Sequence, residues 1–310
     1  MKIYKHPLNG AKNAKGMGNF NFTTKVTTTE AANKIDYNNK ILMLGSCFTT
    51  EIGKILQDYK FDVMANPFGV LYNPCSISKS IRRLLECTPF REDEIIRTNP
   101  TDPRSPARYA SFWHHSSFSR STCEEFVANA NKSLQSASSF LQKADTIIIT
   151  LGTAWTYRHL QSGEIVSNCH KILAKEFNRE LLTVESCKKE LGEIANALPD
   201  KNIIFTVSPI RHLKDTAHGN QISKATLLLA IEEIVKGYPN CTYFPSYEIM
   251  MDELRDYRFY AEDMLHPSPV AVKYIFEIFK ETHISPLAFK QMESNMRLTK
   301  AENHIQKQIL

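Results

Sequence analysis

The chain has 310 residues, 42% of them hydrophobic, which is enough for one large globular domain with an appendage. Its formal net charge is only +5, and it contains no Lys/Arg run of the kind that forms a nucleic-acid-binding arm. No segment approaches the ~18 consecutive apolar residues of a membrane span. We therefore expect a soluble protein that binds neither nucleic acid nor membrane.

The N-terminus and the cysteines both indicate a cytoplasmic protein. Residues 1–21 are polar and basic, and they lack the apolar stretch and cleavage site of a secretory signal peptide. The seven cysteines are scattered and form no Cys-x-x-Cys pair, which favours reduced thiols over disulfides or structural zinc. The histidines lack HxH or HExxH spacing, so we expect no metal and no other cofactor.

Short apolar runs alternate with amphipathic helical patterns along the chain. The apolar runs have the length of buried parallel strands and lie at 41–44, 61–64, 147–151, 203–207 and 242–244. Helical periodicity is found at 48–59, 77–85, 123–143, 184–198, 221–237 and 269–282. This alternation predicts an α/β fold with a doubly wound, mostly parallel sheet of flavodoxin-like type.

Other segments interrupt or flank this pattern. A hairpin is expected at 155–167 and an extended insertion at 109–118, and the composition of 99–108 predicts a surface loop. The chain then divides into an N-terminal extension (1–39), one α/β domain (40–283) and a C-terminal helical tail (284–310).

Small and polar residues follow four of the predicted strands. They are Gly-Ser-Cys at 45–47, Asn-Pro-Phe-Gly at 66–69, Gly-Thr-Ala-Trp at 152–155 and Ser-Pro-Ile-Arg-His at 208–212. Ligands of an open parallel sheet bind at the carboxyl ends of its strands. We expect the site at this edge, joined by Asp-Met-Leu-His at 263–266.

Ser46 stands where the first strand turns into the first helix, and Gly45 permits a tight turn there. At such a turn the hydroxyl is exposed, and the N–H groups of the first helical turn can stabilise an oxyanion. A serine hydroxyl needs a base to become a nucleophile. Asp263 and His266 are three residues apart and can supply an imidazole held by a carboxylate. Together these residues predict acyl transfer by a Ser-His-Asp triad.

The chain resembles the GSCFA family, which is related to the SGNH, or GDSL-like, hydrolases. The segments that carry the resemblance are, in order, LGSCFTTEIGKIL, NPFGVLYNP, TLGTAWTY, SNCHK, SPIRHLKD and FYAEDMLHPS. SGNH hydrolases include esterases, lipases, carbohydrate deacetylases and some acyltransferases. The resemblance implies Ser46 as nucleophile and oxyanion donor and Gly69 as a second N–H donor. It also implies that Asp263 and His266 complete the triad.

The sequence departs from the superfamily pattern in two segments. SGNH enzymes present an asparagine in the third segment, where this chain has Gly-Thr-Ala-Trp, so Thr153, Asn66 or Asn168 would have to supply that oxyanion donor. In the first segment, alignment on the glycine places Cys47 at the nucleophile position. We favour Ser46 and keep Cys47 as the alternative.

Further side chains near the strand ends are candidates for substrate binding. Arg211 and His212 follow a strand end, where a guanidinium could clamp a carboxylate or phosphate; the alternative is an ion pair with an acidic residue such as Asp215. Trp155 could stack on a sugar or acyl group, or pack in the core. His170 is expected to orient substrate or to be structural, and not to bind metal.

The expected function is hydrolysis of an ester that carries a small acyl group, such as acetyl, on a sugar or polar metabolite. The chain has neither a long apolar lid nor an amphipathic membrane helix, which argues against a lipase. Acyl transfer, a thiol hydrolase that uses Cys47, and a noncatalytic binding module remain as alternatives. The sequence does not determine the oligomeric state.

Overall fold

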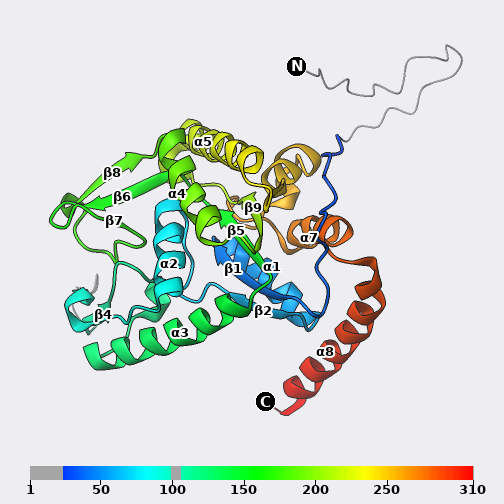
Figure 1. The fold of residues 1–310 in the computed structure, drawn as a ribbon, viewed down its shortest axis with the longest axis horizontal. Helices are drawn as coiled ribbons and strands as arrows, with labels where there is room; N and C mark the ends of the chain where they lie inside the picture. The colour runs from blue at the N-terminus through cyan, green and yellow to red at the C-terminus, as the bar shows by residue number, and fades with distance from the viewer. Residues whose placement is uncertain (1–23, 99–105, 310) are drawn as a thin grey trace, which may run out of the picture.

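The computed structural model describes residues 24–98 and 106–309 (Figure 1). Its central sheet is parallel, with the strand order β10-β9-β5-β1-β2. The strands are β1 (Lys40–Gly45), β2 (Asp62–Ala65), β5 (Thr146–Leu151), β9 (Asn202–Val207) and β10 (Cys241–Phe244). Renumbered among themselves, these strands have the order 2-1-3-4-5 of flavodoxin-like sheets. The predicted doubly wound α/β fold is confirmed.

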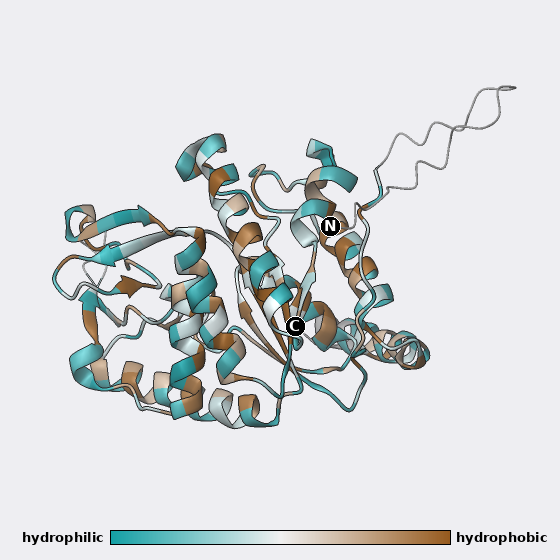
Figure 2. Ribbon diagram, turned by 45° about the horizontal axis from the view of Figure 1, so that its top comes forward, coloured by the Kyte–Doolittle hydropathy of each residue, from teal (hydrophilic) through white to brown (hydrophobic). Residues whose placement is uncertain are grey.

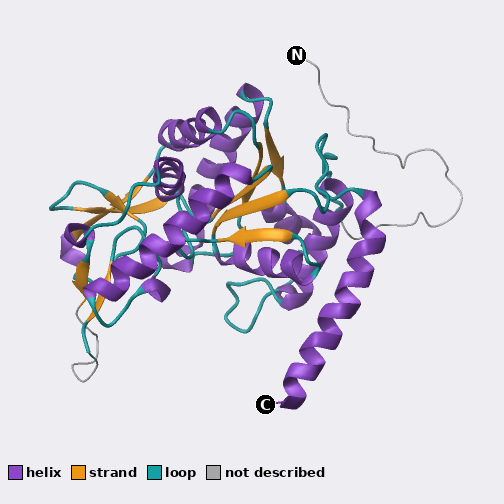
Figure 3. Ribbon diagram, turned by 60° about the horizontal axis from the view of Figure 1, so that its bottom comes forward, coloured by secondary structure: helices purple, strands orange, loops and turns teal. Residues whose placement is uncertain are grey.

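Helices cover both faces of this sheet (Figure 3). One face carries α2 (Pro74–Glu86), α3 (Cys123–Lys143), α4 (Val184–Ala197) and α5 (Thr216–Gly237). The other face carries α1 (Cys47–Asp58), α7 (Pro269–His283) and a π-helix over Ile249–Glu253, which follows the short α6 (Ser246–Glu248). Within the described ranges, every helix is too short or too polar to cross a membrane.

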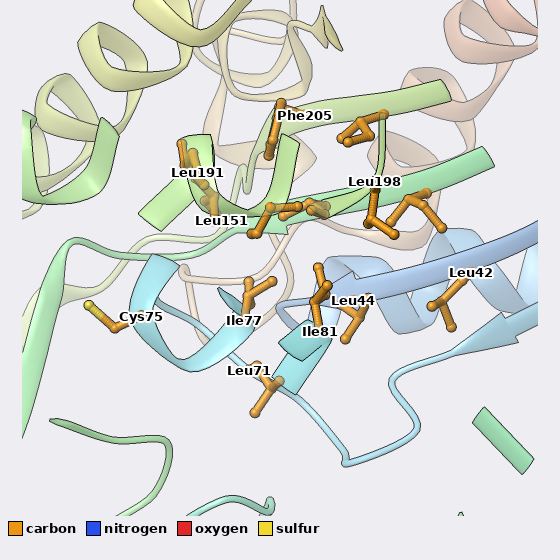
Figure 4. Close-up of a cluster of buried hydrophobic side chains, with 14 of the residues drawn as sticks. Leu42, Leu44, Leu71, Cys75, Ile77, Ile81, Leu151, Leu191, Leu198 and Phe205 are labelled. Carbon is orange, nitrogen blue, oxygen red and sulfur yellow. The ribbon is translucent and has the colours of Figure 1, made fainter. Parts of the chain in front are cut away.

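The core lies on both faces of the sheet, as β1 illustrates. Successive side chains of a strand point to opposite faces, and Leu42 and Leu44 pack into one hydrophobic cluster while Ile41 and Met43 pack into the other. Figure 4 shows the first of these clusters, and the brown central strands of Figure 2 show how apolar this layer is. A strand buried on both faces has no polar side, which explains why it reads as a continuous apolar run.

A second, antiparallel sheet projects from one side of the body (Figure 1). It consists of β7 (Ile165–Val166), β6 (Trp155–His159) and β8 (Phe177–Leu181), so the hairpin expected at 155–167 is present. Strand β8 was not predicted, because its residues Phe-Asn-Arg-Glu-Leu are mostly polar and follow no clear period. The extended piece expected at 109–118 begins as β4 (Arg108–Ala110), paired with β3 (Ile96–Thr98), but ends in a 3-10 turn over Ser116–Phe118.

The segments that flank the domain pack against one end of it. The C-terminal α8 (Phe289–Ile309) lies beside α1, and the Thr299 hydroxyl donates to the Asp58 carbonyl at 2.7 Å. Ile35 pairs with Ile284 in an isolated bridge, so residues before β1 and after α7 run side by side there. Residues 1–23 of the expected N-terminal extension and residues 99–105 of the expected surface loop lie outside the described part of the chain.

Buried His114 makes stability depend on pH. Its ring is fully buried, with Nδ1 2.7 Å from the Ser111 hydroxyl, and burial together with Arg83 lowers its pKa to about 3, from an ordinary value of 6.5. Below pH ~6.5 the unfolded chain therefore binds a proton at His114 that the folded chain does not bind. The neutral buried ring contributes its full stabilisation above this pH, and the free energy of unfolding decreases as the pH falls below it. The loss from this group is about 1.4 kcal/mol per pH unit.

Urea denaturation of the wild type between pH 7 and pH 5 should show this decrease in the free energy of unfolding. In His114→Phe the free energy of unfolding should fall less steeply with pH, by about 1.4 kcal/mol per pH unit. Phenylalanine suits the site because Phe68, Phe90 and Phe126 already surround the ring. If the free energy of unfolding depended equally on pH in the two proteins, the assignment of this effect to His114 would be wrong.

Candidate active site

The turn between β1 and α1 is built on Gly45. Its φ is +147°, and a Cβ placed there would lie 2.2 Å from the Thr150 carbonyl oxygen, so only glycine fits. The Gly45 N–H donates to the side-chain oxygen of Asn66 at 2.9 Å. This close approach of β1 to β5 lies at the switch point of the sheet, where ligands of such folds bind.

Ser46, the residue expected to be the nucleophile, is completely buried. Its hydroxyl donates to the Ser208 hydroxyl at 3.0 Å, and its N–H donates to the Thr150 carbonyl at 3.2 Å. In this conformation both groups are therefore hydrogen-bonded inside the protein. The role of Ser46 as nucleophile and oxyanion donor stays a prediction.

Cys47 is the residue of this pair that faces open space. It lines a cavity of about 400 Å³, together with His266 and Tyr72, and its sulfur lies 3.7 Å from the Tyr72 hydroxyl. Burial raises the pKa of Tyr72, so the phenol remains protonated and can donate to the sulfur. Because α1 begins at Cys47, the N–H of this residue has no acceptor within the helix and is a candidate oxyanion donor.

His266 and Asp263 form the hydrogen-bonded pair that the sequence predicts. The Asp263 carboxylate lies 2.5 Å from His266 Nδ1, and its other oxygen accepts the N–H groups of Leu265 and His266 at 2.9 and 3.0 Å. These hydrogen bonds lower the pKa of Asp263 to about 2. With Nδ1–H donated to the carboxylate, His266 Nε2 is the nitrogen left to accept a proton.

Four of the expected binding residues line the same cavity: Thr153, Trp155, Arg211 and His212. The Thr153 hydroxyl lies 3.0 Å from the Ser223 hydroxyl and accepts the Trp155 N–H at 3.0 Å. Burial, with smaller effects from Lys224, His266 and Arg179, lowers the pKa of His212 to about 3, so its ring is neutral. Its Nε2 is buried and has no partner among the described residues.

Gly69, Asn66, Asn168 and His170 form hydrogen bonds within the protein in this conformation. The Gly69 N–H, expected to stabilise an oxyanion, donates to the Asn66 carbonyl at 2.8 Å. The Asn66 side chain accepts the Gly45 N–H and donates to the Thr50 hydroxyl. Asn168 accepts the His170 N–H at 2.8 Å, and His170 Nε2 lies 2.7 Å from the Ser111 carbonyl. None of these four residues is among the described residues that line the cavity.

The structure adds four residues that the sequence did not single out: Tyr72, Arg179 and Lys214, which line the cavity, and Lys224. The Tyr72 carbonyl accepts the N–H groups of both Gly152 and Thr153, at 2.7 and 3.0 Å. Arg179 comes from the unpredicted strand β8. Lys224 is buried and donates to the Gly152 and Ser208 carbonyls at 2.7 Å each, and burial lowers its pKa to about 7. The position of Lys224 among the apolar residues of α5 was the sequence feature that could have indicated a buried lysine.

The fold and the cavity together define an α/β protein with a doubly wound sheet, whose switch point carries a thiol, an imidazole and a carboxylate. The family model described as GSCFA matches residues 40–279, most of the chain. The chain belongs to the GSCFA family. A search of curated proteins returns no match.

Proposed function

We propose that this protein cleaves or transfers the acyl group of an ester through a thioester on Cys47. His266 is the general base, and Asp263 holds its imidazole. The observation that carries this proposal is that Cys47 and His266 line one cavity, whereas the Ser46 hydroxyl is buried against Ser208. Cys47 therefore replaces Ser46 as the nucleophile, while the reaction class expected from the sequence is kept.

The residues of the cavity account for each step of such a reaction. The Cys47 thiol gives its proton to His266 Nε2, and the sulfur attacks the carbonyl carbon of the ester. The oxyanion that forms is stabilised at the N-terminus of α1. The C–O bond then breaks, and the leaving alkoxide takes the proton from the imidazolium. Water, or an acceptor alcohol, attacks the thioester next, and the thiol is restored.

One observation favours a second candidate, a noncatalytic binding module. The N–H groups of Ser46 and Gly69 both donate to backbone carbonyls, so the oxyanion hole implied by the resemblance is not open in this conformation. Loss of one such donor typically costs about 10²–10³-fold in rate. This candidate keeps the cavity and predicts no turnover.

Trapping of the acyl-enzyme tests the proposal directly. The wild-type protein is mixed with p-nitrophenyl acetate, quenched in acid within the first turnovers, and digested for peptide mapping by mass spectrometry. The acetyl group is expected on Cys47, because acid preserves a thioester. An acetyl group on Ser46 would restore the serine mechanism, and no stable label together with no release of p-nitrophenol would favour the binding module.

The control for this experiment is Cys169, a second half-buried thiol in the same chain. Burial raises its pKa to about 11, so it should remain a thiol and react slowly near neutral pH. Acetylation of Cys47 and Cys169 to the same extent would mean nonspecific chemistry and would contradict the proposal.

A further inference from the structure

The cavity that holds Cys47 and His266 has an excess of positive charge. Arg179, Arg211 and Lys214 line it, while Asp215 is the one carboxylate among its described lining residues. The number of charges that lack a partner determines which substrates such a cavity prefers, because an unpaired charge in a partly enclosed site attracts a group of opposite sign.

Arg179 is already neutralised by Asp215, with which it forms an ion pair. The Asp215 side chain is only 3% exposed and the Arg179 side chain is 29% exposed, so the carboxylate is removed from water and the guanidinium partly so. The guanidinium also lies 4.9 and 5.4 Å from the ring centroids of Trp155 and Tyr157. This packing holds Arg179 in place, so the side chain forms part of the cavity wall and its charge is not available to a substrate.

Arg211 and Lys214 are the charges without a carboxylate. The Arg211 guanidinium donates to the Met264 carbonyl at 3.3 Å and lies 5.4 Å from the ring centroid of Tyr260. The Lys214 ammonium contacts the hydroxyl and ring of Tyr157. Among residues 24–98 and 106–309 neither group forms an ion pair with an acidic side chain. Two positive charges therefore remain available in the cavity.

The other groups that line this cavity do not cancel these charges. Arg211 also borders a second pocket that holds Asp252 and Asp256, but it forms an ion pair with neither of them. His212 is neutral near pH 7, and Trp155 and Tyr157 present aromatic rings. Asp263 is engaged with His266 and is not among the described lining residues. A guanidinium and an ammonium that share an aromatic-walled cavity are well suited to a carboxylate or phosphate.

We propose that the substrate carries an anionic group, a carboxylate or phosphate, that binds Arg211 and Lys214 while its ester carbonyl lies at Cys47. This inference rests on the proposed function and narrows its substrate class. A neutral ester would occupy the same cavity without using either charge. A preference for anionic over neutral esters therefore distinguishes a site built for an anionic substrate from one built for a neutral substrate.

Paired esters test the inference by kinetics. For the wild type, kcat/KM is measured with p-nitrophenyl acetate and with mono-p-nitrophenyl succinate, which adds a carboxylate. We expect a preference for the succinate ester of about 10-fold or more, the usual size of a charge-assisted hydrogen bond. Lys214→Met and Arg211→Gln should each reduce this preference several-fold, mainly through KM, and added salt should also reduce it. Lys236→Met is the matched control, because Lys236 is exposed and pairs with Glu232.

A binding experiment separates failure of the inference from failure of the proposed function. Calorimetric titration of the Cys47→Ala variant with succinate and with inorganic phosphate needs no turnover, and the tighter anion identifies the group. If no ester is hydrolysed, the proposed function fails, and the titration alone decides whether an anion site exists. If esters are hydrolysed without a preference for the succinate ester, or if neither anion binds, the inference is overturned.

Discussion

Cys47→Ala should lower kcat/KM for p-nitrophenyl acetate by about 10³-fold or more, because it removes the atom that forms the acyl-enzyme in the proposed mechanism. Ser46→Ala, one residue away, should change kcat/KM by less than about 10-fold. Among the described residues the Ser46 hydroxyl is hydrogen-bonded to the buried Ser208 hydroxyl, so its removal should instead reduce the free energy of unfolding by about 1–3 kcal/mol. Comparison of these two variants therefore distinguishes a loss of catalysis from a loss of stability.

Both variants are measured beside the wild type, with folding checked by circular dichroism and stability by urea denaturation. His266→Ala should match Cys47→Ala in its effect on kcat, since base and nucleophile act as a unit. The reverse pattern, with activity lost in Ser46→Ala and kept in Cys47→Ala, would return the nucleophile to Ser46. It would also require the β1–α1 turn to rearrange when substrate binds.

Gly45→Ala should destabilise the fold by about 3 kcal/mol or more, or prevent folding altogether. The new Cβ would lie 2.2 Å from the Thr150 oxygen and 2.8 Å from the Thr49 hydroxyl, and the backbone φ of +147° is itself unfavourable for alanine. Neither β1 nor β5 can move away, because both are buried at the centre of the sheet. Urea denaturation gives the effect directly.

Gly237→Ala is the control for this prediction. Gly237 ends α5, does not have a positive φ, and has no described atom within 4 Å of the position that an added Cβ would take. Alanine there should leave stability unchanged or raise it by up to about 1 kcal/mol, because it reduces the freedom of the unfolded chain. If Gly45→Ala were as stable as Gly237→Ala, the steric account of the turn would be wrong.

Much of the fold could be predicted because each central strand is buried on two faces. The runs at 41–44, 147–151 and 203–207 have no polar side, and they appear in the structure as β1, β5 and β9. The start of α5 could not be predicted: the helix begins at Thr216, whereas the periodicity begins at 221. Its first turn includes Gly219 and Asn220, which carry no apolar signal, and a tertiary contact from Asn220 to the His212 N–H fixes it.

The site was harder to predict than the fold, and the adjacent Ser46 and Cys47 show why. The motif places both at the end of β1, but only the three-dimensional turn, which includes a φ of +147° at Gly45, shows that Ser46 is buried and that Cys47 lines the cavity. Hydrophobic periodicity in a sequence contains no information about the φ angle of one residue. Arg179 was missed for another reason: its strand pairs with Trp155–His159 across the small sheet, and that pairing depends on contacts distant in sequence.

The order of the site along the chain has a consequence for biosynthesis. Cys47 leaves the ribosome before His266. His266 lies in a loop held by hydrogen bonds between the Arg211 N–H and the Leu265 carbonyl and between the Ala261 N–H and the His266 carbonyl. Under the proposed mechanism, synthesis must therefore pass residue 266 before the thiol can meet its base. The growing polypeptide would then carry an unactivated cysteine during translation, and its reactivity would begin only when the last part of the domain docks.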